Sequence, residues 1–255
     1  MPIPVPLDAP SQLKSLVAQK GAKQKSRAWL DARRNILTCS DIAAVLGDNP
    51  YSTRQDVMNK KLGIGPPFKG NIFTRWGNEH EDEAIERFEQ ITGKSCVDVD
   101  FGLRVHPALK FIGGSPDGIT TDLCLIEIKC PYRRKIIAGK MPLYYKAQVL
   151  VLMEVFNLRK AFYMEYRPGN LIRDEVVNII EIERSPVWFA AQLPKMRAFV
   201  EELTAQRIAI ESSPGYVRTE SESDTEEREP ITMFGRAKNV HFRGVCRIVE
   251  NVETM

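Results

Sequence analysis

The chain has 255 residues, of which 43% are hydrophobic and 27% are charged, enough for one substantial hydrophobic core. Its five cysteines are scattered without a Cys-x-x-Cys pair, so the sequence indicates neither a zinc site nor a disulfide framework. No apolar run approaches the roughly 20 residues that cross a bilayer, and no signal peptide is evident, so we expect an intracellular protein without membrane contact.

The net charge of +3 is spread unevenly along the chain. Glu220–Glu229 holds six acidic residues and one arginine, a net of −5, whereas residues 230–255 carry +2. Residues 1–219 therefore carry about +6, and a basic body suits a polyanion. The acidic stretch from Arg218 to Glu229 is too polar to build a core, so we expect a linker or disordered tail there.

The sequence of the N-terminal half predicts a series of helices. They follow a proline-rich leader and a basic segment, Lys14–Lys25. The expected helices are Arg27–Arg34, Asp41–Leu46, a helix capped by Ser52 or Thr53 that runs through Leu62, and Asn78–Thr92. Gly47 should end the second of them, because glycine readily adopts the left-handed conformation at a helix C-terminus.

The C-terminal half predicts strands mixed with helices. We expect strands near Cys96–Val105, Phe111–Gly113, Leu123–Cys130, Lys160–Tyr166 and Glu175–Ile182, and helices over Lys146–Phe156 and Pro186–Ile210. This order indicates an α/β fold. We divide the chain into a basic, partly flexible leader (1–26), one domain (27–212), and an acidic linker with a C-terminal tail (213–255).

Two short motifs bring charged residues to the predicted strand Leu123–Cys130. Ser-Pro-Asp-Gly places Asp117 in a turn between Pro116 and Gly118. Ten residues later, Glu127 and Lys129 share one strand face, about 7 Å apart at a rise of roughly 3.3 Å per residue. An acidic turn residue followed by Glu-x-Lys on a strand is the pattern of PD-(D/E)xK nucleases, which bind a divalent cation and a phosphate.

A plainer interpretation of the same motifs is a solvated strand face and an ordinary turn. The residues around Glu127 are apolar, however, which predicts a buried strand. Because buried charges are costly unless they are paired or bind a metal, the surroundings favour the catalytic interpretation.

Two further polar residues have alternative interpretations. Glu81 follows Asn78 by three residues, so it fits a capping box as well as it fits a metal site. Gln148 lies in an apolar helix and is either a satisfied core amide or a residue that faces the metal site.

Ser40 and Arg33 also have two interpretations. Ser40 can cap the helix that follows it, or its hydroxyl and that helix start can hold a phosphate. Arg33 lies seven residues earlier and is either solvent-facing or a bidentate clamp on the same phosphate.

Taken in order, these motifs resemble the lambda-exonuclease or YqaJ-type viral recombinase family, also called alkaline exonucleases. The resemblance covers roughly Arg27 to Gln148, and its most specific blocks are Ser-Pro-Asp-Gly and Glu-x-Lys-Cys-Pro. The matching residues are Trp29, Arg33, Thr38-Cys39-Ser40, Trp76-Gly77, Glu81, Ala84, Ser115–Gly118, Glu127–Pro131 and Ala147-Gln148-Val149.

The resemblance implies a restriction-endonuclease-like core, a central mixed β-sheet flanked by helices. It implies Asp117, Glu127 and the Ile128 carbonyl as metal ligands, with Glu81 and Gln148 completing the site. Lys129 would orient and activate the attacking water. Arg33 and Ser40 would match the pocket for a 5′-terminal phosphate.

From the motifs and the resemblance, we expect a 5′→3′ exonuclease on linear double-stranded DNA in recombination, repair or viral DNA processing. Carboxylate oxygens suit Mg²⁺, with Mn²⁺ as a substitute. The resemblance further implies a ring trimer, a single-strand-annealing partner, and a host cell's cytoplasm or nucleus as location. The alternatives are a structure- or sequence-specific endonuclease on the same core and a catalytically idle DNA-binding module.

Overall fold

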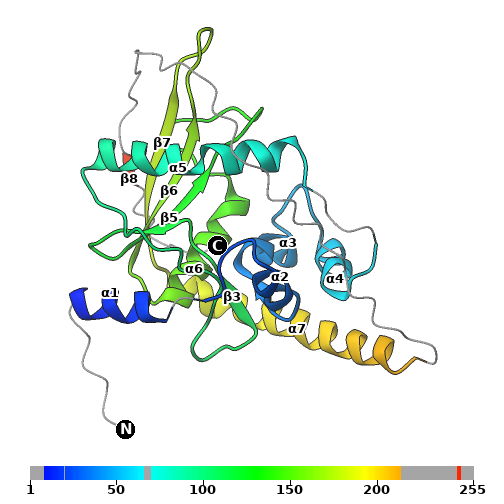
Figure 1. Ribbon diagram of the computed structural model, residues 1–255. Helices are drawn as coiled ribbons and strands as arrows, with labels where there is room; N and C mark the ends of the chain where they lie inside the picture. The colour runs from blue at the N-terminus through cyan, green and yellow to red at the C-terminus, as the bar shows by residue number, and fades with distance from the viewer. Residues whose placement is uncertain (1–8, 20, 66–69, 214–245, 248–255) are drawn as a thin grey trace.

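The centre of the fold is a five-stranded mixed sheet in the order β4-β5-β6-β7-β8 (Figure 1). The computed structural model describes residues 9–19, 21–65, 70–213 and 246–247. The strands are β4 (Gly118–Ile119), β5 (Cys124–Lys129), β6 (Lys160–Arg167), β7 (Val176–Glu183) and β8 (Cys246–Arg247). The expected fold class is therefore confirmed as a mixed α/β arrangement.

The pairing of the strands follows from their connections. β4 and β5 are antiparallel neighbours across a short turn, and β6 and β7 also pair antiparallel. β5 and β6 run parallel, with Glu127 beside Tyr163, and the helix α6 (Leu143–Phe156) joins them. A parallel pair needs such a long crossover connection, which places α6 against the sheet.

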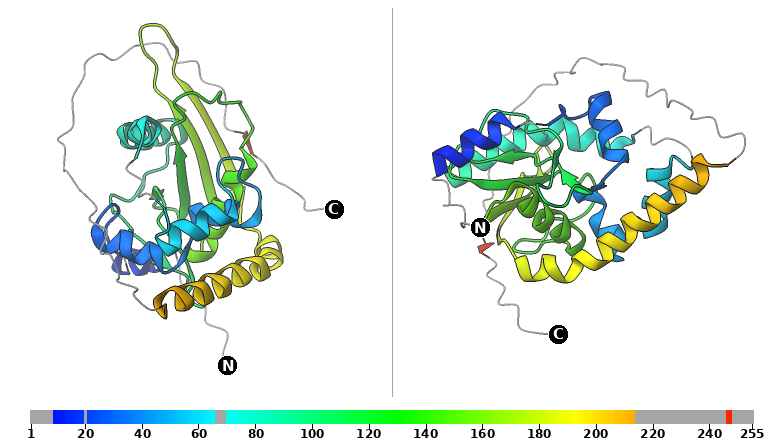
Figure 2. Two further views of the ribbon diagram at one scale, coloured as in Figure 1. Left: turned by 90° about the vertical axis from the view of Figure 1, so that its right-hand side faces the viewer. Right: turned by 90° about the horizontal axis from the view of Figure 1, so that it is seen from below.

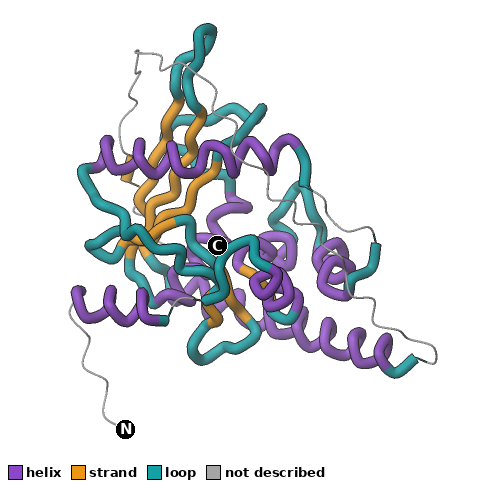
Figure 3. The backbone as a smooth tube through the Cα atoms, in the orientation of Figure 1, coloured by secondary structure: helices purple, strands orange, loops and turns teal. Residues whose placement is uncertain are grey.

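The two faces of the sheet are covered by different helices (Figures 1 and 3). α5 (Ile72–Thr92) packs Ala84 and Phe88 against the face that contains Ile126. α6 packs against the other face, to which Leu125 belongs. The period of 2 along β5 thus places neighbouring side chains in two separate layers, as the sequence predicted.

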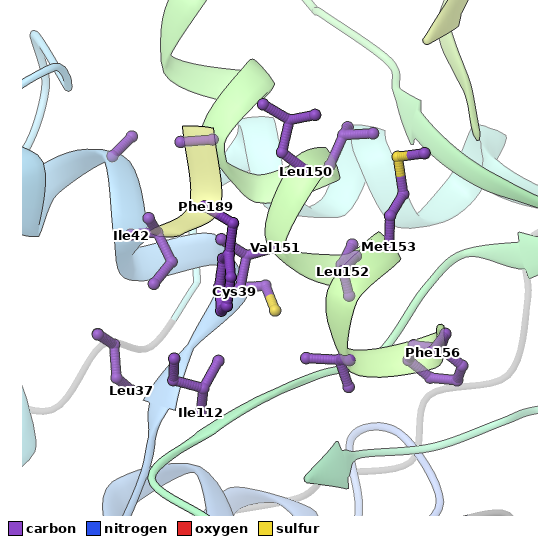
Figure 4. Close-up of a cluster of buried hydrophobic side chains, with 14 of the residues drawn as sticks. Leu37, Cys39, Ile42, Ile112, Leu150, Val151, Leu152, Met153, Phe156 and Phe189 are labelled. Atoms are coloured by element: carbon purple, nitrogen blue, oxygen red, sulfur yellow. The ribbon is translucent and has the colours of Figure 1, made fainter. Parts of the chain in front are cut away.

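α6 is buried on nearly all sides, because it also contacts α3 (Ile42–Leu46) and α7 (Pro186–Glu211). An apolar helix without a polar stripe is expected in such a position. Its residues Leu152 and Met153 have no exposed surface. Figure 4 shows Val151 and Leu152 in a cluster with Cys39, Ile42 and Phe189.

A second, three-stranded sheet has the order β1-β3-β2. Its strands are β1 (Leu37–Thr38), β2 (Arg104–Val105) and β3 (Ile112–Gly114). The other elements are α1 (Ala9–Ala18), α2 (Arg27–Arg34), α4 (Arg54–Leu62) and the 3-10 helix η1 (Cys39–Asp41). Within the predicted leader, α1 buries Leu16 in the main core. In Figure 2, α7 runs past the N-terminal helices along the lower side of the molecule.

Several sequence-based expectations about helix starts were wrong. α5 begins at Ile72 with Asn71 as its cap, so Asn78 and Glu81 do not form a capping box. Gly77 lies inside the helix and does not interrupt it. Ser40 caps no helix either, since it lies within η1 and Asp41 precedes α3.

The expected strand Cys96–Val105 is also wrong over most of its length. Only Arg104–Val105 is a strand, and Cys96 makes a single isolated bridge to Thr120. β4 was missed, because two residues are too few for a period to show.

The acidic segment Arg218–Glu229 lies outside the described residues. Cys246–Arg247 pairs in parallel with Ile180 and Glu181 of β7. Among the described residues, no helix is both long and apolar enough to cross a membrane.

Candidate active site

Asp117 is held against β5 by its own main chain and side chain. Its backbone N–H donates to the Ile126 carbonyl at 3.2 Å, which continues the β4–β5 pairing around the turn. One of its carboxylate oxygens, Oδ2, accepts the backbone N–H of Ile128 at 2.6 Å. These two contacts place the carboxylate at the C-terminal half of β5, beside the Ile128 carbonyl group and Glu127.

Glu127 is the most buried acid of the site, with 1% of its surface exposed. Its Oε1 accepts hydrogen bonds from Lys129 Nζ and from Gln148 Nε2. Its Oε2 is buried and has no hydrogen-bond partner among the residues that the structure describes. A buried carboxylate oxygen without a partner is costly, which is a reason to expect a ligand there.

Asp117 lies at the edge of a cleft of about 860 Å³. Glu81 reaches it from α5, and Asp117, Ile128 and Lys129 reach it from the β4–β5 region. Gln148 reaches the site from α6, where its Nε2 donates to Glu127, so its amide has a partner beside the carboxylates. The structure therefore brings the five polar residues predicted for the catalytic site together from α5, β5, α6 and the turn before β4.

Burial and mutual repulsion raise the pKa values of the carboxyl groups. Burial, followed by the charge of Asp117, raises the pKa of Glu127 to about 8. The same two causes raise the pKa of Glu81 to about 7. Burial also raises the pKa of Asp117. Three acids that disfavour each other's ionisation form a site that a divalent cation would stabilise.

The donor set fits a hard cation that keeps several waters. No three His, Cys, Asp or Glu side chains within the described ranges are arranged to hold a metal. Asp117, Glu127 and the Ile128 carbonyl nevertheless offer neighbouring oxygen donors, and in the described part of the chain Glu127 Oε2 has no other partner. Mg²⁺ uses one or two carboxylates and retains water, so this set suits it better than zinc.

The raised carboxyl pKa values predict how stability depends on pH without metal. The folded-state pKa values of Glu127 and Glu81 lie above the ordinary 4.5, so the folded protein retains protons that the unfolded chain has lost. In a chelator, the melting temperature should fall as the pH rises from about 5 to about 9, and Glu127→Gln should flatten this fall.

Added Mg²⁺ should raise the melting temperature more at about pH 9 than at about pH 6, because metal and protons compete for the same oxygens. Differential scanning fluorimetry with and without Mg²⁺ measures both effects. An identical melting temperature with and without Mg²⁺ at every pH would contradict a metal site.

Arg33 and Ser40 are in direct contact. Arg33 Nη2 donates to Ser40 Oγ at 3.1 Å, and the Arg33 guanidinium lies 4.1 Å above the Trp29 ring. Trp29 Nε1 in turn donates to Ser115 Oγ at 3.0 Å. Because Ser115 precedes Pro116-Asp117, a short series of contacts connects Arg33 and Ser40 with the carboxylates. Burial lowers the pKa of Arg33.

Sequence reasoning missed several residues of the site. In the sequence, Ser115 stands out only as part of a turn motif, and Trp29 only through the family resemblance. Lys25 lies close enough to Glu81 and Asp117 for its charge to lower both carboxyl pKa values, although burial dominates them. Its left-handed backbone (φ 65°) gives no signal in the sequence. Lys129 Nζ also lies 5.4 Å from the Tyr145 ring centroid.

The sequence matches a known domain family. The model of the YqaJ-like viral recombinase domain matches residues 28–159, just over half of the chain. The uncharacterized protein R354 of Acanthamoeba polyphaga mimivirus is 30% identical over 161 residues, which are 56% of this chain and 29% of that protein. Protein D345L of African swine fever virus is 27% identical over 158 residues, 50% of this chain and 44% of that protein. The chain spans less than half the length of these viral relatives.

Solved structures share the fold. An alkaline exonuclease from Laribacter hongkongensis has a TM-score of 0.62 and 27% identity, covering 73% of this chain and 96% of that chain. A phage-related exonuclease from Haemophilus somnus has a TM-score of 0.53 and 16% identity, covering 69% and 96%. The mixed sheet with its flanking helices is thus the restriction-endonuclease-like fold of the alkaline exonucleases, and the chain belongs to the YqaJ-like viral recombinase family of the lambda-exonuclease type.

Proposed function

We propose that this chain is a Mg²⁺-dependent exonuclease that degrades linear double-stranded DNA in the 5′→3′ direction from 5′-phosphorylated ends. Family and fold indicate a nuclease of the alkaline exonuclease type acting on DNA. The observation that carries the proposal is that Asp117 and Lys129 lie at one cleft beside Glu127, whose Oε1 accepts from Lys129 and whose buried Oε2 has no hydrogen-bond partner among the described residues. Its biological setting would be recombination, repair or viral DNA processing.

The chemistry requires no side-chain nucleophile. A divalent cation bound there would lower the pKa of a water molecule and neutralise charge on the phosphate. Asp117, Glu127 and the Ile128 carbonyl would hold it, and Gln148 fixes the orientation of the Glu127 carboxylate. Lys129 Nζ, anchored on Glu127 Oε1, would orient the water and stabilise the negative charge of the transition state.

The terminal-phosphate pocket, defined by Arg33 and Ser40, would set the polarity. A terminal phosphate is more negative than an internal diester and accepts a bidentate guanidinium. Arg33 stacks on Trp29 and is oriented by Ser40, so its position is fixed before DNA arrives. Each cleavage would leave a new 5′-phosphate for the same pocket.

Arg33→Ala should lower the preference for 5′-phosphoryl over 5′-hydroxyl ends by roughly ten- to a hundred-fold, because one charge-assisted contact is worth about 1.5–3 kcal/mol. Digestion rates of the two linear duplexes provide the measurement. Arg34→Ala is the matched control, since the neighbouring Arg34 is exposed on the same turn. Digestion from 3′ ends would overturn the polarity even if the metal site holds.

Digestion of closed circular duplex distinguishes the proposed exonuclease from the alternative functions. An exonuclease leaves the circle intact, whereas a structure- or sequence-specific endonuclease on the same core cuts it. An idle DNA-binding module degrades neither circle nor linear duplex in Mg²⁺ or Mn²⁺.

A ring-shaped oligomer, with three subunits by resemblance, and a single-strand-annealing partner belong to the same proposal. The ring would enclose DNA and keep the enzyme on it during successive cleavages. Analytical ultracentrifugation of the full chain tests the subunit number, and a monomer at working concentration would exclude the ring.

A further inference from the structure

A buried ion pair, Lys61 with Asp41, contacts the main chain of Arg33 in the proposed terminal-phosphate pocket. Lys61, in the last turn of α4, has 4% of its surface exposed, and Asp41, just before α3, has 6%. Lys61 Nζ lies 3.0 Å from Asp41 Oδ2. The same ammonium donates to the backbone carbonyl of Arg33 at 2.6 Å. One buried cation therefore connects three elements, α2, α4 and the start of α3.

The contacts of this pair form a closed loop through the pocket. Asp41 Oδ2 accepts the Thr38 hydroxyl at 2.5 Å, and that hydroxyl lies 3.3 Å from Ser40 Oγ. Ser40 Oγ accepts from the Arg33 guanidinium, and the Arg33 carbonyl accepts from Lys61. Both the main chain and the side chain of Arg33 are thus tied to the same pair.

Stability alone is a weak explanation for this arrangement. A buried ion pair loses much of its attraction to the cost of removing both charges from water, and a well-packed apolar pair often replaces it without loss. What an apolar pair would not reproduce is the directed hydrogen bond to the Arg33 carbonyl. Burial lowers the pKa of Lys61 to about 8 and Asp41 opposes this, so the ammonium remains mostly charged near neutral pH.

We propose that Lys61 and Asp41 are positioning residues of the terminal-phosphate pocket, which hold Arg33 against Ser40 in the orientation that grips a 5′-terminal phosphate. The proposal rests on the function proposed above. Lys61 fixes the end of α2, Asp41 fixes Thr38 and thereby the Ser40 hydroxyl, and neither residue touches the DNA itself.

The test uses Lys61→Met in the full chain, with Lys60→Met as matched control. Lys60 also binds Asp41, at 2.6 Å, but its side chain is 56% exposed. Lys61→Met should lower the preference for 5′-phosphoryl ends about tenfold, through KM for phosphorylated duplex, with kcat nearly unchanged. Lys60→Met should stay within about twofold of the wild type, and Lys61→Arg should recover part of the preference.

Two further measurements keep the outcome decisive. If Lys61→Met does not fold, Asp41→Asn/Lys61→Met removes both buried charges and leaves only the exposed Lys60 without its partner Asp41. Hydrogen exchange of the Arg33 Nε–H, followed by NMR without DNA, should be about tenfold faster in the folded variant than in the wild type.

The positioning role would be overturned if Lys61→Met loses thermal stability but keeps the wild-type preference for 5′-phosphoryl ends and the wild-type exchange rate of the Arg33 Nε–H. A wild type that does not distinguish the two ends would instead overturn the proposed function, and the Arg33 exchange would still decide whether Lys61 orients the guanidinium.

Discussion

Replacing Glu127 with glutamine, or Asp117 with asparagine, should lower the cleavage rate by at least about a thousandfold while DNA binding is retained. Both substitutions keep the shape of the side chain and remove a negative charge. Glu127→Gln keeps an oxygen that accepts from Lys129 and Gln148. At the position of Oε2, which has no hydrogen-bond partner among the described residues, it places an amide nitrogen, which is a poor metal ligand. The folded protein should become more stable in chelator, because repulsion among the acids is relieved.

The measurement is single-turnover digestion of 5′-phosphorylated linear duplex in Mg²⁺, with fluorescence anisotropy in Ca²⁺ for binding. Asp122→Asn is the matched control, since Asp122 lies in the turn at the other end of β5 and its carboxylate pairs with Lys94. Full activity of either site variant would exclude the metal-site assignment. Loss of binding together with activity would instead indicate a damaged fold.

The sequence predicted the strand that positions these carboxylates because its signal is local. Alternation along β5 sends Leu125 and Glu127 to one face and Ile126 to the other, and apolar neighbours show that both faces are covered. The bounds of α2 were predicted correctly, and α7 ends one residue beyond the predicted Ile210. In each case the deciding residues lie within a few positions of the feature that they predict.

The features that sequence reasoning missed depend on residues far apart in the chain. Gly114 lacks a side chain where Cys39 packs closely, since a Cβ on Gly114 would lie 2.6 Å from Cys39 Sγ. No local sequence pattern predicts this contact. From the sequence, Lys61 resembles an ordinary exposed helix lysine. Only the folded chain shows that it donates to the Arg33 carbonyl of α2. The Trp29–Ser115 bond joins residues 86 positions apart, so only the folded chain reveals how the pocket connects to the carboxylates.

Lys129→Met should lower kcat by roughly a hundred- to a thousand-fold, the loss typical of one preorganised donor aimed at transition-state charge. Burial opposes ionisation of Lys129, but Glu127 and Asp117 outweigh it and raise its pKa. The ammonium therefore stays charged at neutral pH, so it would act as a donor rather than as a base. KM for DNA should change little, since the group would act mainly on the reacting phosphate.

Lys129 would have a second role if its charge mainly neutralised the Glu127 carboxylate. Measurements of metal binding distinguish this role from stabilisation of the transition state. If Lys129 acts in the transition state, Lys129→Met binds Mn²⁺ at least as tightly as the wild type, because removing a cation from the site favours a divalent ion. Isothermal titration calorimetry measures this, and Lys94→Met, which removes the partner of Asp122, is the matched control. A variant that binds Mn²⁺ normally and keeps kcat within about tenfold would exclude the transition-state role, since that loss is below the hundredfold expected for a lost donor.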